Sequence, residues 1–261
     1  MDIKDNKLIR TEIININTKD RDKTAFPDPQ RCDLFIPPIK HVVRAEIVAS
    51  QIPHSQYPVN SKNNQFVATS SASPAVSEVT LTLTAGNYTA AELATEIQTQ
   101  LNGATFLNGA KSTCVFNTTT RKFEINRTDG GGTITMLFGS NPLPSSSAAY
   151  LLGYIEEDVS PATDVSPPNV ANIGGDDYIL LYIDGLNNSF SASRARYFAK
   201  FQMDVAYGYY SMNKFICNPM EFRRGANFRK LSLRFEDPNG QLVLFNNQDA
   251  SFDIRFTYIA G

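Results

Sequence analysis

The chain has 261 residues, of which 42% are hydrophobic and 19% charged, so it can bury a sizeable core. The net charge is −2 and the 24 basic residues are spread along the chain, so the sequence shows no basic cluster typical of a nucleic-acid binder, which argues against direct nucleic-acid binding. The charged start MDIKDNKLIR is not typical of a signal peptide, and no run of about 18 apolar residues predicts a membrane span.

Residues 1–30 are predicted to form an extended N-terminal arm. Within it, Ile14 and Ile16 point to one side of a possible strand, and the polar, proline-containing stretch NTKDRDKTAFPDPQ follows as a connector. Two alternatives remain open at this point. The arm either docks on a folded surface or is a disordered leader, because termini are mobile unless contacts hold them.

Short, alternating, β-branched runs begin at residue 32 and continue to the end of the chain. They include CDLFIPP, HVVRAEIVASQIP, EVTLTLT, the hairpin pattern KSTCVFNTTTRKFEINRT, DYILLYIDGL and the closing SFDIRFTYI. Turn residues separate these runs, which is typical of a sandwich or barrel. The sequence therefore predicts an all-β fold with a single domain over residues 31–261 and a long surface connection over residues 140–176.

One amphipathic helix is predicted at about residues 89–102, in LTLTAGNYTAAELATEIQTQLN. Thr89 and Glu92 have the spacing of a capping box, and Leu93, Ile97 and Leu101 form one narrow apolar stripe. No alternation of strands and helices surrounds it, so it is expected to cover a β-sandwich rather than to connect parallel strands.

The sequence contains few residue patterns that are typical of catalytic or metal-binding sites. Both histidines, His41 and His54, lie beside strands without a nucleophile or carboxylate at a motif spacing, and a structural role is favoured for them. The cysteines Cys32, Cys114 and Cys217 are far apart and lack a CxxC spacing, so reduced core thiols are expected rather than disulfides or a zinc site. We expect no catalytic, cofactor-binding or metal-binding residues and no enzymatic activity.

Aromatic and basic residues near the C-terminal third are the candidates for an interface. Aromatic-rich strands serve as core, as subunit interface or as a platform for sugars or bases, and the absence of tryptophan weakens the last of these. A basic pair in an RRG sequence fits an ordinary loop or a contact with an acidic partner. The candidate interface residues are Tyr197, Phe198, Tyr207, Tyr209, Tyr210, Arg223 and Arg224, and the loop 140–176 is a second candidate surface.

The order of several segments resembles the single-jelly-roll penton and minor capsid proteins of large icosahedral double-stranded DNA viruses and virophages. These segments are ININTKDRD, DLFIPPIKHVVRAEIVASQIPHSQYPVN, NNQF, the helix region GNYTAAEL, CVFNTTTRKFEI, AAYLLGY and LRFEDPNGQLVLFNNQDASFDIRFTYI. The resemblance implies a jelly-roll β-sandwich, with the helix as an insertion between its strands.

The same resemblance implies a structural capsid protein that is made in the host cytoplasm and resides in the virion. Its partners would be copies of itself, as a homopentamer at the five-fold vertices, and the neighbouring major and minor capsid proteins. A closed ring needs two different complementary patches on each subunit. The alternatives are a minor, cementing capsid protein between major capsomers, or a jelly-roll module that binds a receptor or carbohydrate.

Overall fold

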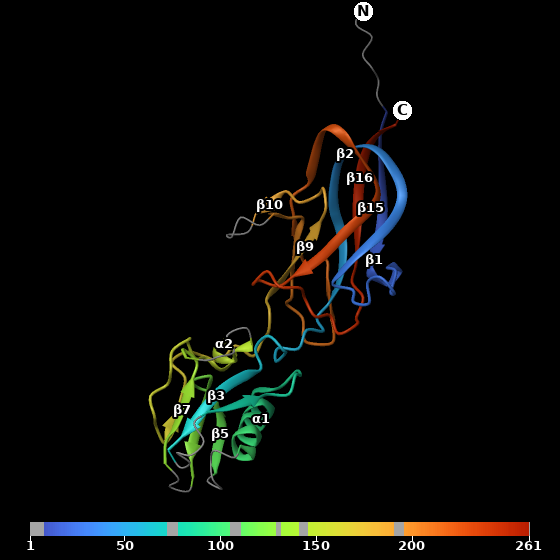
Figure 1. The fold of residues 1–261 in the computed structure, drawn as a ribbon. Coiled ribbons are helices and arrows are strands. Elements are labelled where there is room, and N and C mark those ends of the chain that lie inside the picture. The colour runs from blue at the N-terminus through green and yellow to red at the C-terminus, as the bar shows by residue number, and fades with distance from the viewer. Residues whose placement is uncertain are drawn as a thin grey trace, which may run out of the picture. The chain divides into compact units, whose positions relative to one another are not determined.

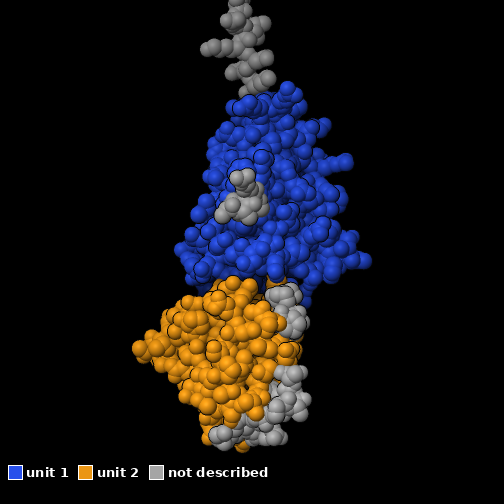
Figure 2. All heavy atoms as spheres, turned by 60° about the vertical axis from the view of Figure 1, so that its left-hand side comes forward, with its two compact units in different colours: residues 1–56, 176–261 blue, residues 57–175 orange. Residues whose placement is uncertain are grey.

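The computed structural model describes residues 8–71, 78–104, 111–128, 132–140, 146–190 and 196–260. The chain divides into two compact units, coloured separately in Figure 2. Unit 1 comprises residues 1–56 and 176–261, and unit 2 comprises residues 57–175. The expected single domain over residues 31–261 is thus replaced by two units. The physical reason is that residues 57–175 bury an apolar cluster of their own, separate from the cluster of unit 1.

Unit 1 is an all-β sandwich (Figure 1). Seven strands of its eight-stranded sheet follow the order β1, β16, β2, β15, β9, β12, β14, and β13 pairs with β2. A separate ribbon joins β10 to β11. The bounds are β1 Leu8–Asn17, β2 Arg31–Pro53, β9 Tyr178–Ile183, β10 Ser189–Phe190, β11 Arg196–Tyr197, β12 Ala199–Gln202, β13 Tyr210–Met212, β14 Phe215–Cys217, β15 Met220–Glu236 and β16 Ser251–Ala260, with a short 3-10 helix at Thr18–Asp20.

Two long strands, β2 and β15, bend together and connect the layers of the sandwich. Their register shifts between Glu221 and Lys230, where a corner forms. His41 has φ 56° and Gly225 has φ 73°, and a Cβ on Gly225 would lie 3.2 Å from the His41 Cα. Only glycine fits so close an approach without strain. The corner lets both strands contribute to both layers, which gives the predicted jelly-roll-like sandwich.

The core of unit 1 follows the alternation in the sequence. The last strand, β16, buries Phe252, Ile254 and Phe256, as its period of two predicts. All residues from Ile179 to Ile183 of β9 are buried, as is typical for a nearly continuous apolar run such as DYILLYIDGL in a strand covered on both faces.

The N-terminal segment docks on its own chain. β1 pairs with β16 along its whole length, from Leu8 opposite Ala260 to Asn17 opposite Ser251. Behind it, the buried Arg21 holds residues 18–27 through hydrogen bonds to backbone carbonyls and to Asp249. The docking alternative therefore holds for residues 8–30 of the predicted arm, while residues 1–7 lie outside the described residues.

Within its described residues, unit 2 contains two small sheets and two helices. The sheets have the strand orders β4, β3, β7 and β5, β6, β8. The bounds are β3 Gln65–Ser70, β4 Val79–Thr82, α1 Ala90–Gly103, β5 Ser112–Asn117, β6 Lys122–Arg127, β7 Ile134–Leu137, α2 Ala149–Leu152 and β8 Asp164–Val165.

The predicted helix and its capping box are confirmed in α1. The Glu92 amide donates to the Thr89 hydroxyl, the Glu92 carboxylate accepts from the Thr89 amide, and Leu93, Ile97 and Leu101 are buried. The helix packs on the core of unit 2. Two polar side chains, of Gln98 and Asn102, bond the backbone of β5 and so cover the outer edge of that strand.

The expected surface connection over residues 140–176 has many exposed residues, but it also contributes to the unit 2 core. It contributes α2, β8 and the buried residues Leu151, Leu152, Tyr154 and Val165. The serine- and proline-rich composition concealed these few apolar anchors. Residues 141–145 of this segment lie outside the described residues.

Candidate assembly surfaces

The structure separates the predicted interface residues. Phe198 is fully buried, with 0% of its surface exposed, and it belongs to the core of unit 1 rather than to an interface. Its amide donates to the Leu181 carbonyl, which directs the side chain inward. Tyr197 and Tyr207 are half-buried. The prediction for Phe198 is wrong because an aromatic-rich run does not show which of its rings face the core, and Phe198 lies at a bend between β11 and β12 with its ring buried.

Tyr209 and Tyr210 are exposed, and the structure adds two residues that the sequence prediction missed. These are Met212 and Ile216, both exposed. All four lie between residues 209 and 216, and we call this stretch the apolar segment. An exposed cluster of large apolar side chains is typical of a protein contact surface.

The backbone of the apolar segment is held firmly. The Tyr209 carbonyl accepts from the His54 amide at 2.8 Å, and the Ser211 hydroxyl donates to the Gln202 carbonyl at 2.6 Å. The Ser50 backbone amide donates to the Asn213 side-chain oxygen, and the Asn213 backbone amide donates to the Ser50 carbonyl, both at 2.9 Å. A surface fixed in this way loses little conformational entropy when it binds.

Arg223 and Arg224 are exposed on β15, beside the corner formed with His41. Neither makes an ion pair among the described residues. They lie outside the apolar segment, so the structure does not join the predicted aromatic and basic residues into one site.

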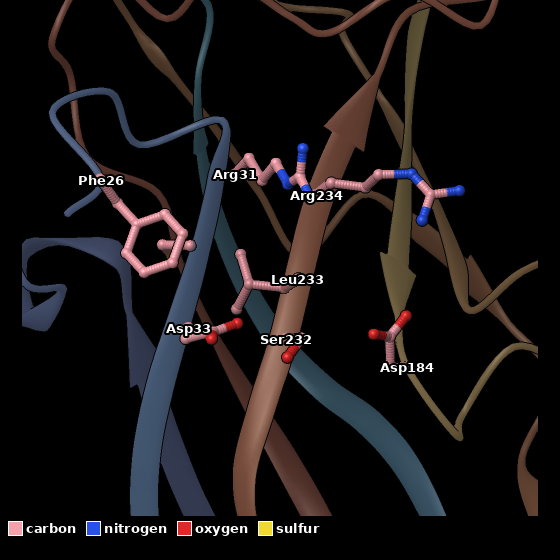
Figure 3. Close-up of a pocket in the computed structure, with 8 residues that line it drawn as sticks. Phe26, Arg31, Asp33, Asp184, Ser232, Leu233 and Arg234 are labelled. Carbon is pink, nitrogen blue, oxygen red and sulfur yellow. The ribbon is translucent and has the colours of Figure 1, made fainter.

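A hollow of about 490 Å³ lies over β2 and β15, and Figure 3 shows the residues that line it. Arg31 lies opposite Arg234 in the strand register, and Asp33 lies opposite Ser232. Asp184 follows β9 on the other side of β15. The lining of the hollow thus includes two positive side chains, of Arg31 and Arg234, and two negative ones, of Asp33 and Asp184.

Charges around this hollow are partly neutralised within the chain. The Lys230 ammonium lies 3.0 Å from the Asp33 carboxylate, and the Arg234 Nε donates to Glu236 at 2.6 Å. The Arg234 guanidinium also stacks over the Tyr182 ring at 4.2 Å, and burial raises the pKa of that phenol to about 12. With both signs of charge present, the hollow does not select a small anion or cation.

Phe35 lies on β2 next to this hollow, opposite Lys230, and is 83% exposed. The sequence prediction missed it, although the signal was present. In CDLFIPP, Cys32, Leu34 and Ile36 alternate inward, so Phe35 must point outward. Phe35, Lys230 and the hollow form a second surface, which we call the β2–β15 surface.

The histidines and cysteines occupy structural positions. The His54 ring is buried at hydrogen-bond distance from the Val205 carbonyl, and the His41 amide donates to Asn227 at the corner. Burial raises the pKa of both the Cys32 and the Cys114 thiols to about 12, which keeps these thiols protonated and poorly nucleophilic.

A metal centre is not formed within the described ranges: no three His, Cys, Asp or Glu side chains there come together as ligands. In the same part of the chain, none of the helices has the length and apolar character needed to cross a membrane.

Comparison with known proteins gives a family and similar solved structures. The model of the family of unknown function DUF5901 matches residues 2–192, more than half of the 261 residues. No curated protein matches the chain by sequence. A solved structure, that of the selenomethionine-labelled mavirus penton protein, is similar with a TM-score of 0.42 and 13% identity, over 95% of this chain and 99% of that chain. The chain belongs to the family of unknown function DUF5901.

Proposed function

We propose that this protein is a structural capsid protein of an icosahedral virus, located in the virion as the penton at the five-fold vertices. Its partners are further copies of itself, in a homopentamer, and the neighbouring capsid proteins. Contacts between proteins, rather than chemistry on a substrate, are its activity.

The observation that carries the proposal is the apolar segment on a rigid jelly-roll-like sandwich. Tyr209 is 67% exposed, yet the backbone around it is held by hydrogen bonds to His54, directly after β2, and to Gln202 of β12. Large apolar side chains presented by a fixed backbone are a feature of the central residues of stable interfaces. The order of sequence segments that resembles penton and minor capsid proteins supports the same function.

A closed ring of identical subunits needs two different surfaces that fit each other. Unit 1 offers two, because the apolar segment pairs with the C-terminal end of β2 at Pro53, whereas Phe35 lies near its N-terminal end. We propose that the apolar segment of one copy contacts the β2–β15 surface of the next. Aromatic residues would then meet the exposed Phe35, with the charged hollow at the rim.

Replacement of one exposed aromatic residue in each surface tests this function. Tyr209→Glu and Phe35→Glu place a charge in the proposed contact, so neither variant should form rings by size exclusion with light scattering and electron microscopy, while each should keep its circular dichroism spectrum. Tyr150→Glu is the matched control, because Tyr150 is 63% exposed but belongs to α2 of unit 2 and to neither proposed surface. Normal assembly of Tyr209→Glu would show that the apolar segment is not the interface.

A different observation favours a second role for this protein, that of a minor capsid protein located between major capsomers. The long edge of β1 is uncovered among the described residues, and a closed ring formed by the two surfaces above does not use it. Electron microscopy separates the two positions, since a penton forms rings of five and a minor protein of this kind does not.

A further inference from the structure

β1 is a long edge strand without a partner on one side. It pairs with β16 over all ten of its residues, and no other described strand pairs with it. The opposite end of the same sheet is β14, which has only three residues. In unit 2, the edge of β5 is covered by Gln98 and Asn102 of α1. Proteins usually shorten, charge or cover such edges because an open one pairs with other chains.

The side chains of β1 make this edge more apolar than a protected edge. The strand reads LIRTEIININ, with no proline or lysine, and Ile9 and Ile13 are 68% and 54% exposed. Both lie on the face opposite to the buried Ile16. Arg10 and Glu12 are also exposed, and neither makes an ion pair within the part of the chain that the structure describes.

The sequence of β1 is complementary to itself when read in the antiparallel direction about Thr11. In that register Ile9 of one copy faces Ile13 of the other, Arg10 faces Glu12, and Thr11 faces Thr11. We propose that β1 pairs with β1 of a second copy of this chain in this register, across a two-fold axis at Thr11. The sheets of the two copies then become one continuous sheet.

The alternation of the strand separates the two kinds of contact. Ile9, Thr11 and Ile13 share one face, and Arg10 and Glu12 share the other, so apolar pairs form on one side of the joined sheet and ion pairs on the other. Ile9 and Ile13 of each copy thereby gain apolar contacts, and Arg10 and Glu12 gain ion-pair partners in the other copy.

The charges also fix the register. An antiparallel pair about an axis perpendicular to the sheet can slip only by steps that keep each side chain on its face. If one strand slips by two residues in one direction, Arg10 lies opposite Arg10 of the other copy. If it slips by two residues in the other direction, Glu12 lies opposite Glu12. Like charges directly opposite each other are destabilising, so only the register centred on Thr11 satisfies both charges.

This pairing does not depend on the proposed capsid function, because it follows from β1 alone. It joins copies in pairs, whatever other surfaces they use. A ring of five formed by the other surfaces would therefore be doubled by β1, and a chain without those surfaces would be a dimer.

Charge reversal at two exposed positions tests the pairing. Arg10→Glu and Glu12→Arg each place like charges opposite one another, so each variant should have half the assembled mass of the wild type by size exclusion with light scattering. The double variant Arg10→Glu/Glu12→Arg restores opposite charges and should restore the mass. An equal mixture of the two single variants should also form pairs, since one copy then carries two negative and the other two positive charges at the contact.

Cysteine cross-linking tests the register. Thr11→Cys places two thiols opposite each other at a Cα separation of about 4.5–5.5 Å, which a disulfide can bridge. Oxidation should convert this variant to covalent dimers, whereas Lys19→Cys, exposed beyond the end of β1, should stay uncross-linked. A wild-type assembly whose mass is unchanged by both charge reversals would overturn the pairing, as would a wild type that is monomeric at every concentration.

Discussion

The buried arginine behind β1 gives the sharpest test of how unit 1 is held together. The Arg21 side chain is 4% exposed, and its Nη1 lies 2.6 Å from the Asp249 carboxylate, which is 28% exposed. The same guanidinium donates to the carbonyls of Thr18, Phe26 and Pro27 at 2.8–2.9 Å. It thus ties the segment after β1 to the residues just before β16.

The expected loss of stability follows from these contacts. Arg21→Met removes four hydrogen bonds. A hydrogen bond to a charged group contributes about 1.5–3 kcal/mol, but carbonyls near the surface recover bonds to water, so we expect a total loss of about 3–4 kcal/mol. Removing one partner of a fully buried ion pair costs about 3–5 kcal/mol; the partial exposure of Asp249 reduces this to about 2 kcal/mol for Asp249→Asn.

Urea unfolding, followed by hydrogen exchange and mass spectrometry, measures these losses separately for each unit. Exchange should accelerate in peptides of β1 and β16 and remain unchanged in α1, which provides a control within the same molecule. The ion pair between Lys230 and Asp33, whose side chains are 44% and 32% exposed, provides the matched control in a separate variant. Lys230→Met should cost less than about 1 kcal/mol.

A double-mutant cycle measures whether the Arg21 guanidinium and the Asp249 carboxylate stabilise the fold through their mutual contact. The combined variant Arg21→Met/Asp249→Asn should be more stable than the sum of the single losses predicts, with a coupling of about 1.5 kcal/mol. If Arg21→Met cost no more than Lys230→Met, the guanidinium would not be the clamp that holds the N-terminal segment, and the reasoning from burial would be refuted.

Three further predictions concern packing, backbone conformation and acid stability. Ile97→Ala should destabilise unit 2 by about 2–5 kcal/mol in urea unfolding because Ile97 is fully buried, whereas Thr99→Ala on the exposed face should cost less than about 0.5 kcal/mol. Gly225→Val should lower the stability of unit 1 by about 1–3 kcal/mol, since Gly225 has φ 73° and stands close to His41; equal thermal midpoints for variant and wild type would contradict a strained corner. The Asp158 carboxylate accepts from the backbone amide of Ser140, and this bond lowers its pKa in the folded state. Its stabilisation is therefore complete above about pH 4 and is lost as the pH falls through the folded pKa, so Asp158→Asn should be less stable than wild type at neutral pH, and this difference should shrink as acid is added in circular dichroism titrations.

Local patterns predicted the local structure well. The capping residues Thr89 and Glu92 and the apolar stripe through Ile97 place α1 to within one residue of its observed ends. The alternation of β16 and the continuous apolar character of β9 also give the correct burial. These features depend on residues close in sequence, so a single sequence contains the information.

Long-range pairing could not be read in the same way. The division into two units depends on which strands pair, and the same short alternating runs fit one large sandwich or two smaller units. The β15 pairing with β2 at Leu231 and Leu34 joins residues far apart in the chain, and no local pattern indicates it. For the same reason the aromatic run could not be divided correctly into the buried Phe198 and the exposed Tyr209.

The central claim is that copies of this chain assemble through unit 1. The most direct test is the solution mass of the purified chain by size exclusion with light scattering, followed by electron microscopy of every peak heavier than the 28.9-kDa monomer. The proposed function predicts rings of five copies, doubled in mass where β1 pairs. A chain that remains a monomer at every concentration reached would contradict assembly through these surfaces.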